Sequence, residues 1–138
     1  LKSCADVAMS CNFGFELVIS ELSDIEKKQS KDGVDLYKSI RKTIQFGDMY
    51  RHENPFESDF ASVEYVNEDK SQIVLFCYQT ESKFNEKERR IFIKGADKNN
   101  DYVVNGKKYC GEVLLNKGFR IPLDTYNHHS SVFVFEKN

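Results

Sequence analysis

The spacing of apolar positions changes near residue 47, and this change divides the chain into two parts. Before it, Leu36, Tyr37, Ile40 and Ile44 recur at intervals of three and four residues. This is the spacing of one face of an α-helix. We therefore predict a helix over about residues 34–46.

Signals for starting and stopping a helix surround this segment. Ser23, followed three residues later by Glu26, has the pattern of a capping box, which predicts a helix start. Gly33 is able to break or bend the helix that follows. The step from Phe46 to Gly47 predicts a helix end with glycine in the left-handed cap conformation.

The segment before this helix has a different pattern. Residues 5–10, "ADVAMS", are typical of the end of a short helix or strand. Residues 13–19, "FGFELVI", are apolar on both faces apart from Glu16. Such a run predicts a buried strand of a parallel sheet or barrel, which needs neighbouring elements to cover it.

After residue 47, short runs rich in β-branched and aromatic residues alternate with turn signals. The runs are "ASVEYV", "SQIVLFCYQT", "RRIFIKG", "DYVV", "KKYC" and "SVFVFE". Asn105-Gly106 lies between two of them and predicts a type I′ hairpin. "IVLFCY" (73–78) is apolar on both faces and predicts a central strand, and "SVFVFE" (131–136) a strand that closes the sheet near the end.

The predicted fold is therefore mostly β, an antiparallel β-sandwich preceded by a strand–helix unit. We place the strand–helix unit at residues 1–46 and the sandwich domain at 47–138. The longest apolar run is too short to cross a membrane. A net charge of −2 argues against a nucleic-acid-binding surface.

Cysteine usage bears on the cellular compartment. The four cysteines, Cys4, Cys11, Cys77 and Cys110, form no CxxC pair. Their scatter is typical of reduced, mostly buried thiols. With no secretory signal recognised in the sequence, we expect a cytoplasmic protein.

The three histidines give no metal-binding pattern. His128 and His129 are adjacent, so in an extended segment their side chains point to opposite sides, and His52 stands alone. We interpret all three as solvated loop histidines. "DKNND" (97–101) resembles the start of a calcium loop, but Tyr102 replaces the required glycine and Lys108 the final glutamate. We expect only a turn there.

Carboxylates are plentiful but unspecific. Asp48, Glu53, Glu57 and Asp59 cluster after the predicted helix, where we expect a loop whose acidic groups serve turns and caps. The run "NEKERR" (85–90) is interpreted as a solvated hairpin edge. Tryptophan is absent, and the 7 tyrosines and 11 phenylalanines fall mostly inside predicted strands, so we expect them in the core. We predict no catalytic, cofactor-binding or metal-binding residue.

Several segments together resemble one family over nearly the whole chain. These are "ADVAMSCNFGFEL", "YKSIRKTIQFGDMYRHENPFE", "YVNEDKSQIVLFCY", "IKGADKNNDYVVNGKKYCGEVLLNKG" and "IPL". They are similar to the C-terminal part of bacterial α-galactosidases of glycoside hydrolase family 36. Members of that family carry a β-sandwich, a central (β/α)8 barrel and a C-terminal antiparallel β domain. The resemblance implies that residues 1–46 are the last strand–helix unit of the barrel and residues 47–138 the C-terminal domain.

The resemblance also implies a function. The parent enzyme would hydrolyse terminal α-galactosides such as melibiose and raffinose by a retaining mechanism. Its two catalytic aspartates lie on earlier barrel strands, so no catalytic residue is carried over to this chain. The chain would be structural, with the rest of the enzyme as its partner and a contribution to oligomer contacts.

The chain departs from the family pattern near its start. Cys4 stands where arginine is usual, Cys11 where glycine is common, and Val18 where aspartate is common. We therefore carry over no supporting role at the sugar pocket. Two alternatives remain open, a free-standing carbohydrate-binding module and a non-enzymatic self-association domain.

Overall fold

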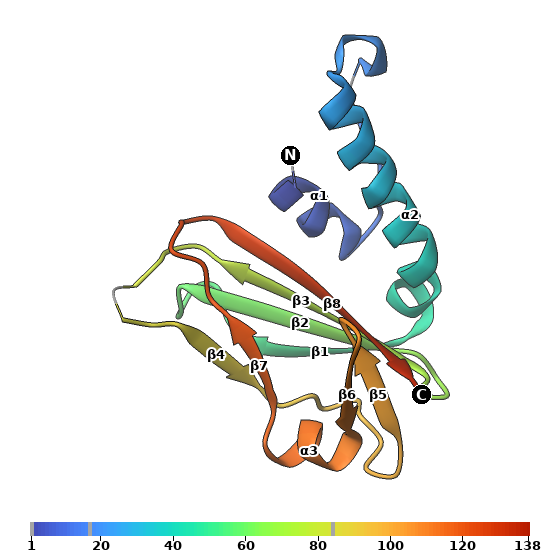
Figure 1. Cartoon of the computed structure of the whole chain (residues 1–138), viewed down its shortest axis with the longest axis vertical. Coiled ribbons are helices and arrows are strands. Elements are labelled where there is room, and N and C mark those ends of the chain that lie inside the picture. The colour runs from blue at the N-terminus through green and yellow to red at the C-terminus, as the bar shows by residue number, and fades with distance from the viewer. Residues whose placement is uncertain (1, 17, 84) are drawn as a thin grey trace.

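The computed structural model describes all residues except 1, 17 and 84 (Figure 1). The elements before residue 47 are α1 (Lys2–Met9), the 3-10 helix η1 (Ile19–Glu21) and α2 (Asp24–Phe46). The strands are β1 (Asp48–Glu53), β2 (Phe60–Val66), β3 (Gln72–Gln79), β4 (Glu88–Ile91), β5 (Asp101–Val104), β6 (Lys107–Cys110), β7 (Phe119–Pro122) and β8 (His129–Lys137). A short helix, α3 (Gly111–Asn116), lies between β6 and β7.

The strands form two sheets. The large sheet has the order β1-β2-β3-β8-β5-β6, and the small sheet pairs β4 with β7. All neighbouring strands are antiparallel. Figure 1 shows the small sheet and α3 on one side of the large sheet and α1 and α2 on the other. The predicted mostly β, antiparallel architecture is confirmed, and the run 73–78 lies in β3, inside the large sheet.

Each face of the large sheet has its own apolar core because successive side chains of a strand point to opposite faces. In β3, Ile73 and Leu75 belong to the core under the small sheet, which we call the sandwich core. Val74 and Phe76, between and beside them, belong to the core under the helices, which we call the helical core. Both faces of β3 are fully covered, and this explains why its sequence is apolar without alternation.

Two local predictions are confirmed in detail. Asn105 and Gly106 both have positive φ, 50° and 74°, as a type I′ turn requires, and they join β5 to β6. Ser23 and Glu26 form a complete capping box at the start of α2. The helix then continues through Gly33 as a single 23-residue element.

The predicted role of Gly47 is wrong. Its φ of −84° and ψ of 169° are extended, so no left-handed cap forms. A Cβ atom at this position would lie 2.3 Å from the carbonyl oxygen of Val66. Glycine is needed here because the chain passes directly against β2 as it leaves the helix.

The strand predicted over residues 13–19 is also wrong for the residues described there. Residues 13–16 and 18 belong to no strand, and Ile19 begins a 3-10 turn; residue 17 is not described. A strand exists only when another strand completes its hydrogen-bond ladder. In the described part of the chain, none of the eight strands pairs with this segment.

Besides η1, three elements were not predicted. Strand β1 occupies Asp48–Glu53, where we expected a loop, and it pairs with β2 at the sheet edge through a register shift after Arg51. Strand β7 and helix α3 have only four and six residues. Such short elements depend on tertiary contacts, and the amide of Ile93 donates to the carbonyl of Leu114 in α3.

Candidate functional site

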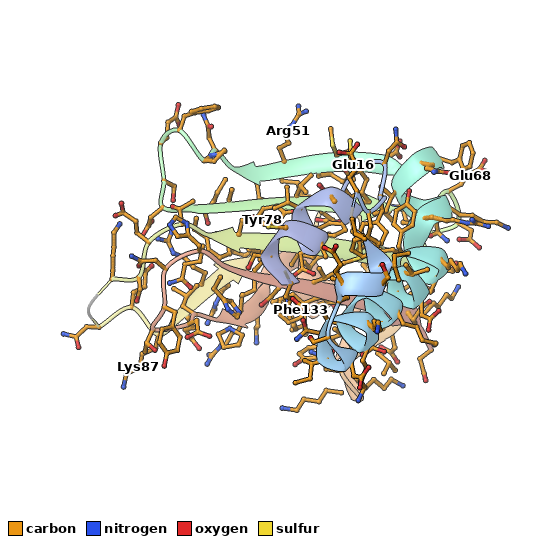
Figure 2. All side chains as sticks on the ribbon, turned by 90° about the horizontal axis from the view of Figure 1, so that it is seen from above. Glu16, Arg51, Glu68, Tyr78, Lys87 and Phe133 are labelled. Carbon is orange, nitrogen blue, oxygen red and sulfur yellow. The ribbon has the colours of Figure 1, made fainter. Side chains whose placement is uncertain are left out.

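The helical layer is α1, residues 10–16 and 18–22, and α2, and it lies on the face of the large sheet opposite the small sheet. Its apolar contacts with the sheet are made by Met9, Ile40 and Ile44, which are buried against β2 and β3. In Figure 2, seen from above, α1 lies over the sheet with Tyr78 beside it, and α2 is seen nearly end-on.

Three tyrosine hydroxyls satisfy carbonyl groups at the end of α1. Tyr65 donates to the Ser10 carbonyl at 2.8 Å, and Tyr37 donates to the Cys11 carbonyl at 3.2 Å. Tyr78 donates to the carbonyl of Asp6 at 3.4 Å. The last carbonyls of a helix have no partner within the helix, so these hydroxyls attach α1 to both the sheet and α2.

A buried carboxylate, together with Lys2 one turn before it, attaches α1 to β8. Asp6 is only 4% exposed, and its Oδ2 accepts from the Ser130 hydroxyl at 2.6 Å and from Lys2 Nζ at 2.5 Å. Lys2 also donates to the Ser130 carbonyl. The sequence analysis missed this site, although Asp6 lies three residues before the buried Met9, on the helix face that meets the sheet.

Burial changes the acidity of these tyrosines. It raises the pKa of Tyr78 to about 12, with the nearby Tyr65 and Asp6 acting in the same direction. Burial also raises the pKa of Tyr65. A neutral phenol is favoured in both places, and a neutral phenol is what the donated hydrogen bonds require.

The outer side of the helical layer is apolar and uncovered. Val18, Ile19 and Ile25 are 60%, 69% and 71% exposed. Three hollows of about 290, 190 and 390 Å³ are lined by Phe15, and they lie between α1, residues 13–16 and 19–22, and the first half of α2. We call this region, together with Phe15, the outer apolar face.

Most of α2 makes little contact with the sheet. Its buried residues are Ile40, Thr43 and Ile44, all in the last two turns. Figure 1 shows the first half of α2 projecting beyond the sheet. Ile25, in this first half, is 71% exposed, and clustered exposed apolar residues often mark an interaction surface.

The histidines are only partly as predicted. His128 is exposed in a turn, but His52 lies in β1 with its side chain only 6% exposed. Its Nε2 is 2.8 Å from Glu64 Oε2, and Glu64 is fully buried. Glu64 also accepts from the amides of Lys94 and Gly95 at 3.0 and 2.6 Å. The interpretation of His52 as a solvated loop residue was wrong, because β1 turns this side chain under the sheet towards a buried carboxylate.

The third histidine also has partners. His129, the first residue of β8, lies 3.3 Å from Asp124 through Nδ1 and 3.3 Å from the Ser131 hydroxyl through Nε2. The amide of Asp124 donates to the Gln79 side chain. These contacts hold the loop before β8 against β3.

Two of the four predicted turn and cap carboxylates, Glu53 and Asp59, instead form ion pairs with an arginine. Glu53 and Asp59 each lie 3.1 Å from the guanidinium of Arg89, which is also stacked over the Phe60 ring. Burial opposes ionisation of Asp59, but the hydrogen bond from Lys83 and the charges of Lys83 and Arg89 lower its pKa overall. Arg89 is three-quarters buried, so the run 85–90 is not a purely solvated edge.

"DKNND" forms a turn, with Asp97 accepting from the amides of Asn99 and Asn100, as predicted. In the part of the chain that the structure describes, no group of three or more His, Cys, Asp or Glu side chains could hold a metal ion. No helix among the described residues has the length and the apolar run needed to cross a membrane.

The cysteines are all free, but the prediction that most are buried was wrong. Cys77 is buried in β3, and burial raises the pKa of its thiol. Cys4, Cys11 and Cys110 are exposed.

Comparison with known proteins identifies where this arrangement occurs. Residues 60–135 match the family described as "Glycosyl hydrolase family 36 C-terminal domain". The chain is 37% identical over 123 residues to the α-galactosidase AgaA of Geobacillus stearothermophilus, covering 88% of this chain and 17% of AgaA. It is 32% identical over 130 residues to the probable α-galactosidase G of Aspergillus terreus, covering 94% of this chain and 18% of that protein.

Solved structures agree over the whole chain. The crystal structure of AgaA superposes with a TM-score of 0.94 at 33% identity, covering 99% of this chain and 19% of AgaA. The α-galactosidase of Lactobacillus brevis superposes with a TM-score of 0.90 at 28% identity, covering 99% of this chain and 20% of that one. The chain thus spans no more than a fifth of the length of these relatives. It belongs to glycosyl hydrolase family 36 and carries the C-terminal domain of that family.

Proposed function

We propose that this chain works as the C-terminal, non-catalytic portion of an α-galactosidase that acts on terminal α-galactosides such as melibiose and raffinose. Relatives matched over most of this chain are α-galactosidases, and one was crystallised with raffinose. Residues 1–46 would belong with the catalytic barrel of the enzyme and residues 47–138 with its C-terminal domain. We propose no catalytic residue, cofactor or metal in this chain.

The outer apolar face is the observation that carries the proposal. Its exposed residues, Val18, Ile19 and Ile25, lie on the elements that leave the sheet, while the sandwich core is closed by the chain's own strands. The hollows beside Phe15 are of a size that side chains from another element can fill. In this proposal, the rest of the α-galactosidase packs there, so that the sandwich domain supports the barrel from outside.

A chimeric enzyme tests the proposal. The region of AgaA that matches this chain is replaced by the 138 residues, and cleavage of nitrophenyl α-galactoside is measured together with thermal inactivation. We expect an active chimera, because the fold of this region is shared. Ile25→Asp in the chimera should lower the inactivation temperature by several degrees, because it buries a charge at the interface.

Val113→Asp is the matched control. Val113 is an exposed apolar residue on α3, beyond the opposite face of the sheet. Its substitution should leave the chimera unchanged. Equal effects of the two substitutions, or cleavage of the substrate by the 138-residue chain alone, would overturn the proposal.

Two further properties follow as proposals. Three exposed free thiols are typical of a reducing compartment, so we propose a cytoplasmic location. Thiol titration of protein extracted under trapping conditions should find Cys4, Cys11 and Cys110 reduced. We also propose that the assembled enzyme is an oligomer, which light scattering on the chimera would test.

A further inference from the structure

A second surface lies far from the outer apolar face, at the other end of α2. A groove of about 780 Å³ runs between the last turns of α2, the turn joining β2 to β3, and the end of β8. Figure 2 shows Glu68, from the β2–β3 turn, beside the C-terminal end of α2. The volume is within the range of sites for small ligands.

Side chains along the floor of the groove are fixed by one another. The side-chain NH2 group of Gln72 donates to the Glu136 carboxylate at 2.7 Å and to the Ser39 carbonyl. The side-chain oxygen of Gln72 accepts from the hydroxyl of the buried Thr43. The side-chain oxygen of Asn67 accepts a hydrogen bond from the backbone amide of Gln72 at 2.9 Å. These bonds join α2, β3 and β8, so the carboxylate of Glu136 is held in place before a ligand arrives.

One wall of the groove is an aromatic ring. Phe46, the last residue of α2, lines the groove and is 83% exposed. The phenylalanines of β2, β3, β7 and β8, in contrast, are all in the two cores. The face of an exposed aromatic ring can pack against C–H groups of a ligand, while the polar side chains beside the ring can hydrogen-bond to the polar groups of the same ligand.

The charge of the groove limits the ligand. Its lining residues include three acidic side chains, Glu68, Asp69 and Glu136, and one basic side chain, Lys42. This balance repels phosphates and carboxylates. Carboxylates and an ammonium group hydrogen-bond well with neutral hydroxyls.

We propose that this groove binds a hexopyranose unit of a neutral oligosaccharide, with one face of the sugar ring on Phe46 and its hydroxyls on Glu136, Glu68 and Lys42. A sugar ring has both an apolar C–H face and closely spaced hydroxyls, and it carries no charge. The groove would thus hold substrate at a distance from any catalytic centre. Only the choice of an α-galactoside as probe rests on the proposed function.

Titration of the 138-residue chain with raffinose, followed by amide chemical shifts, tests the inference. We expect saturable shifts at residues around the groove, with a dissociation constant on the order of 1 to 10 mM, as for a shallow site with one aromatic ring. Phe46→Leu should weaken binding about fivefold. Phe56→Leu is the matched control, since Phe56 is 94% exposed on the β1–β2 loop, and it should change nothing.

Glucose 6-phosphate provides the charge control and should bind more weakly than raffinose. Shifts that are absent around the groove, that persist unchanged in Phe46→Leu, or that are stronger with the phosphate would overturn the inference. Self-association that Phe46→Leu abolishes, without sugar binding, would assign the groove to a second copy and also overturn it. A chimera that is active while the groove binds no sugar would leave the proposed function intact and remove only this inference.

Discussion

The two faces of the large sheet are closed in different ways. On the sandwich side, β4, β7 and α3 cover a core whose aromatic rings pack edge to face. The ring centroid of Phe119 lies 5.0 Å from that of Phe135 and 5.1 Å from that of Phe133. On the helical side, α1 is held by hydrogen bonds from Tyr65, Tyr78 and Ser130, and apolar residues of the same layer remain exposed. Among the described residues, the sandwich core is closed by strands and a helix of this chain, whereas exposed apolar residues of the helical layer, such as Ile19 and Ile25, lie on its outer side.

The largest expected effect is in the sandwich core. Phe135 is fully buried on β8, so Phe135→Ala should lower the free energy of unfolding by about 4 kcal/mol. Urea unfolding followed by circular dichroism measures this. A loss below about 1 kcal/mol would mean that the core is not closed as described.

A somewhat smaller effect is expected for the buried carboxylate of the same face. Glu64→Leu removes the acceptor of the Lys94 and Gly95 amides and the partner of His52. We expect a loss of about 3 kcal/mol, since buried donors remain without partners. Glu68→Leu, on the exposed turn, is the control and should stay within about 0.5 kcal/mol.

On the helical side, the attachment of α1 should be weaker. Asp6→Asn should cost about 1 to 2 kcal/mol, because the Ser130 hydroxyl keeps an acceptor but Lys2 loses its ion pair. Hydrogen exchange should rise in α1 while β3 stays protected. Uniformly faster exchange in both would show instead that the two faces unfold as one unit.

Alkaline pH should loosen the same attachment. The raised pKa of Tyr78, about 12, means that its contribution is complete below the unfolded value of about 10 and is lost as the pH rises to about 12. After allowance for solvent screening, the loss is on the order of 1 kcal/mol. Tyr78→Phe should flatten this part of the stability profile, and Tyr126→Phe, in an exposed loop, should not.

The smallest effect should occur on the outer apolar face of the isolated chain. Ile25→Asp should change the free energy of unfolding by no more than about 0.5 kcal/mol, since Ile25 is 71% exposed. The same substitution is expected to matter in the chimera. A large loss in the isolated chain would mean that Ile25 packs within this chain, contrary to the comparison of the two faces.

Sequence patterns predicted the elements whose signals are local. The capping box at Ser23, the hairpin at Asn105-Gly106 and the two-sided apolar run of β3 carry their structure in neighbouring residues. Strand β1 was missed because an edge strand exposes residues such as Met49 on one face and pairs on one side only. Tertiary contacts decide such elements, and a local pattern does not record them.

The site was harder to predict than the fold. Asp6, Glu64 and Arg89 each have at least one partner 30 or more residues away, and the local sequence does not show that these contacts bury them. Gly47 has its role because of Val66, on another strand. The apolar run "FGFELVI" showed that this segment needs a covering partner. Whether it forms a strand or an exposed apolar face depended on a partner strand, which the local pattern does not record.

Hydrogen exchange over residues 18–36, measured in the isolated chain and in the AgaA chimera, tests the central claim most directly. If the outer apolar face packs against the rest of an α-galactosidase, protection of η1 and the first half of α2 should rise at least about tenfold in the chimera, while β3 and β8 stay unchanged. Equal protection of residues 18–36 in the two proteins, in an active chimera, would contradict it.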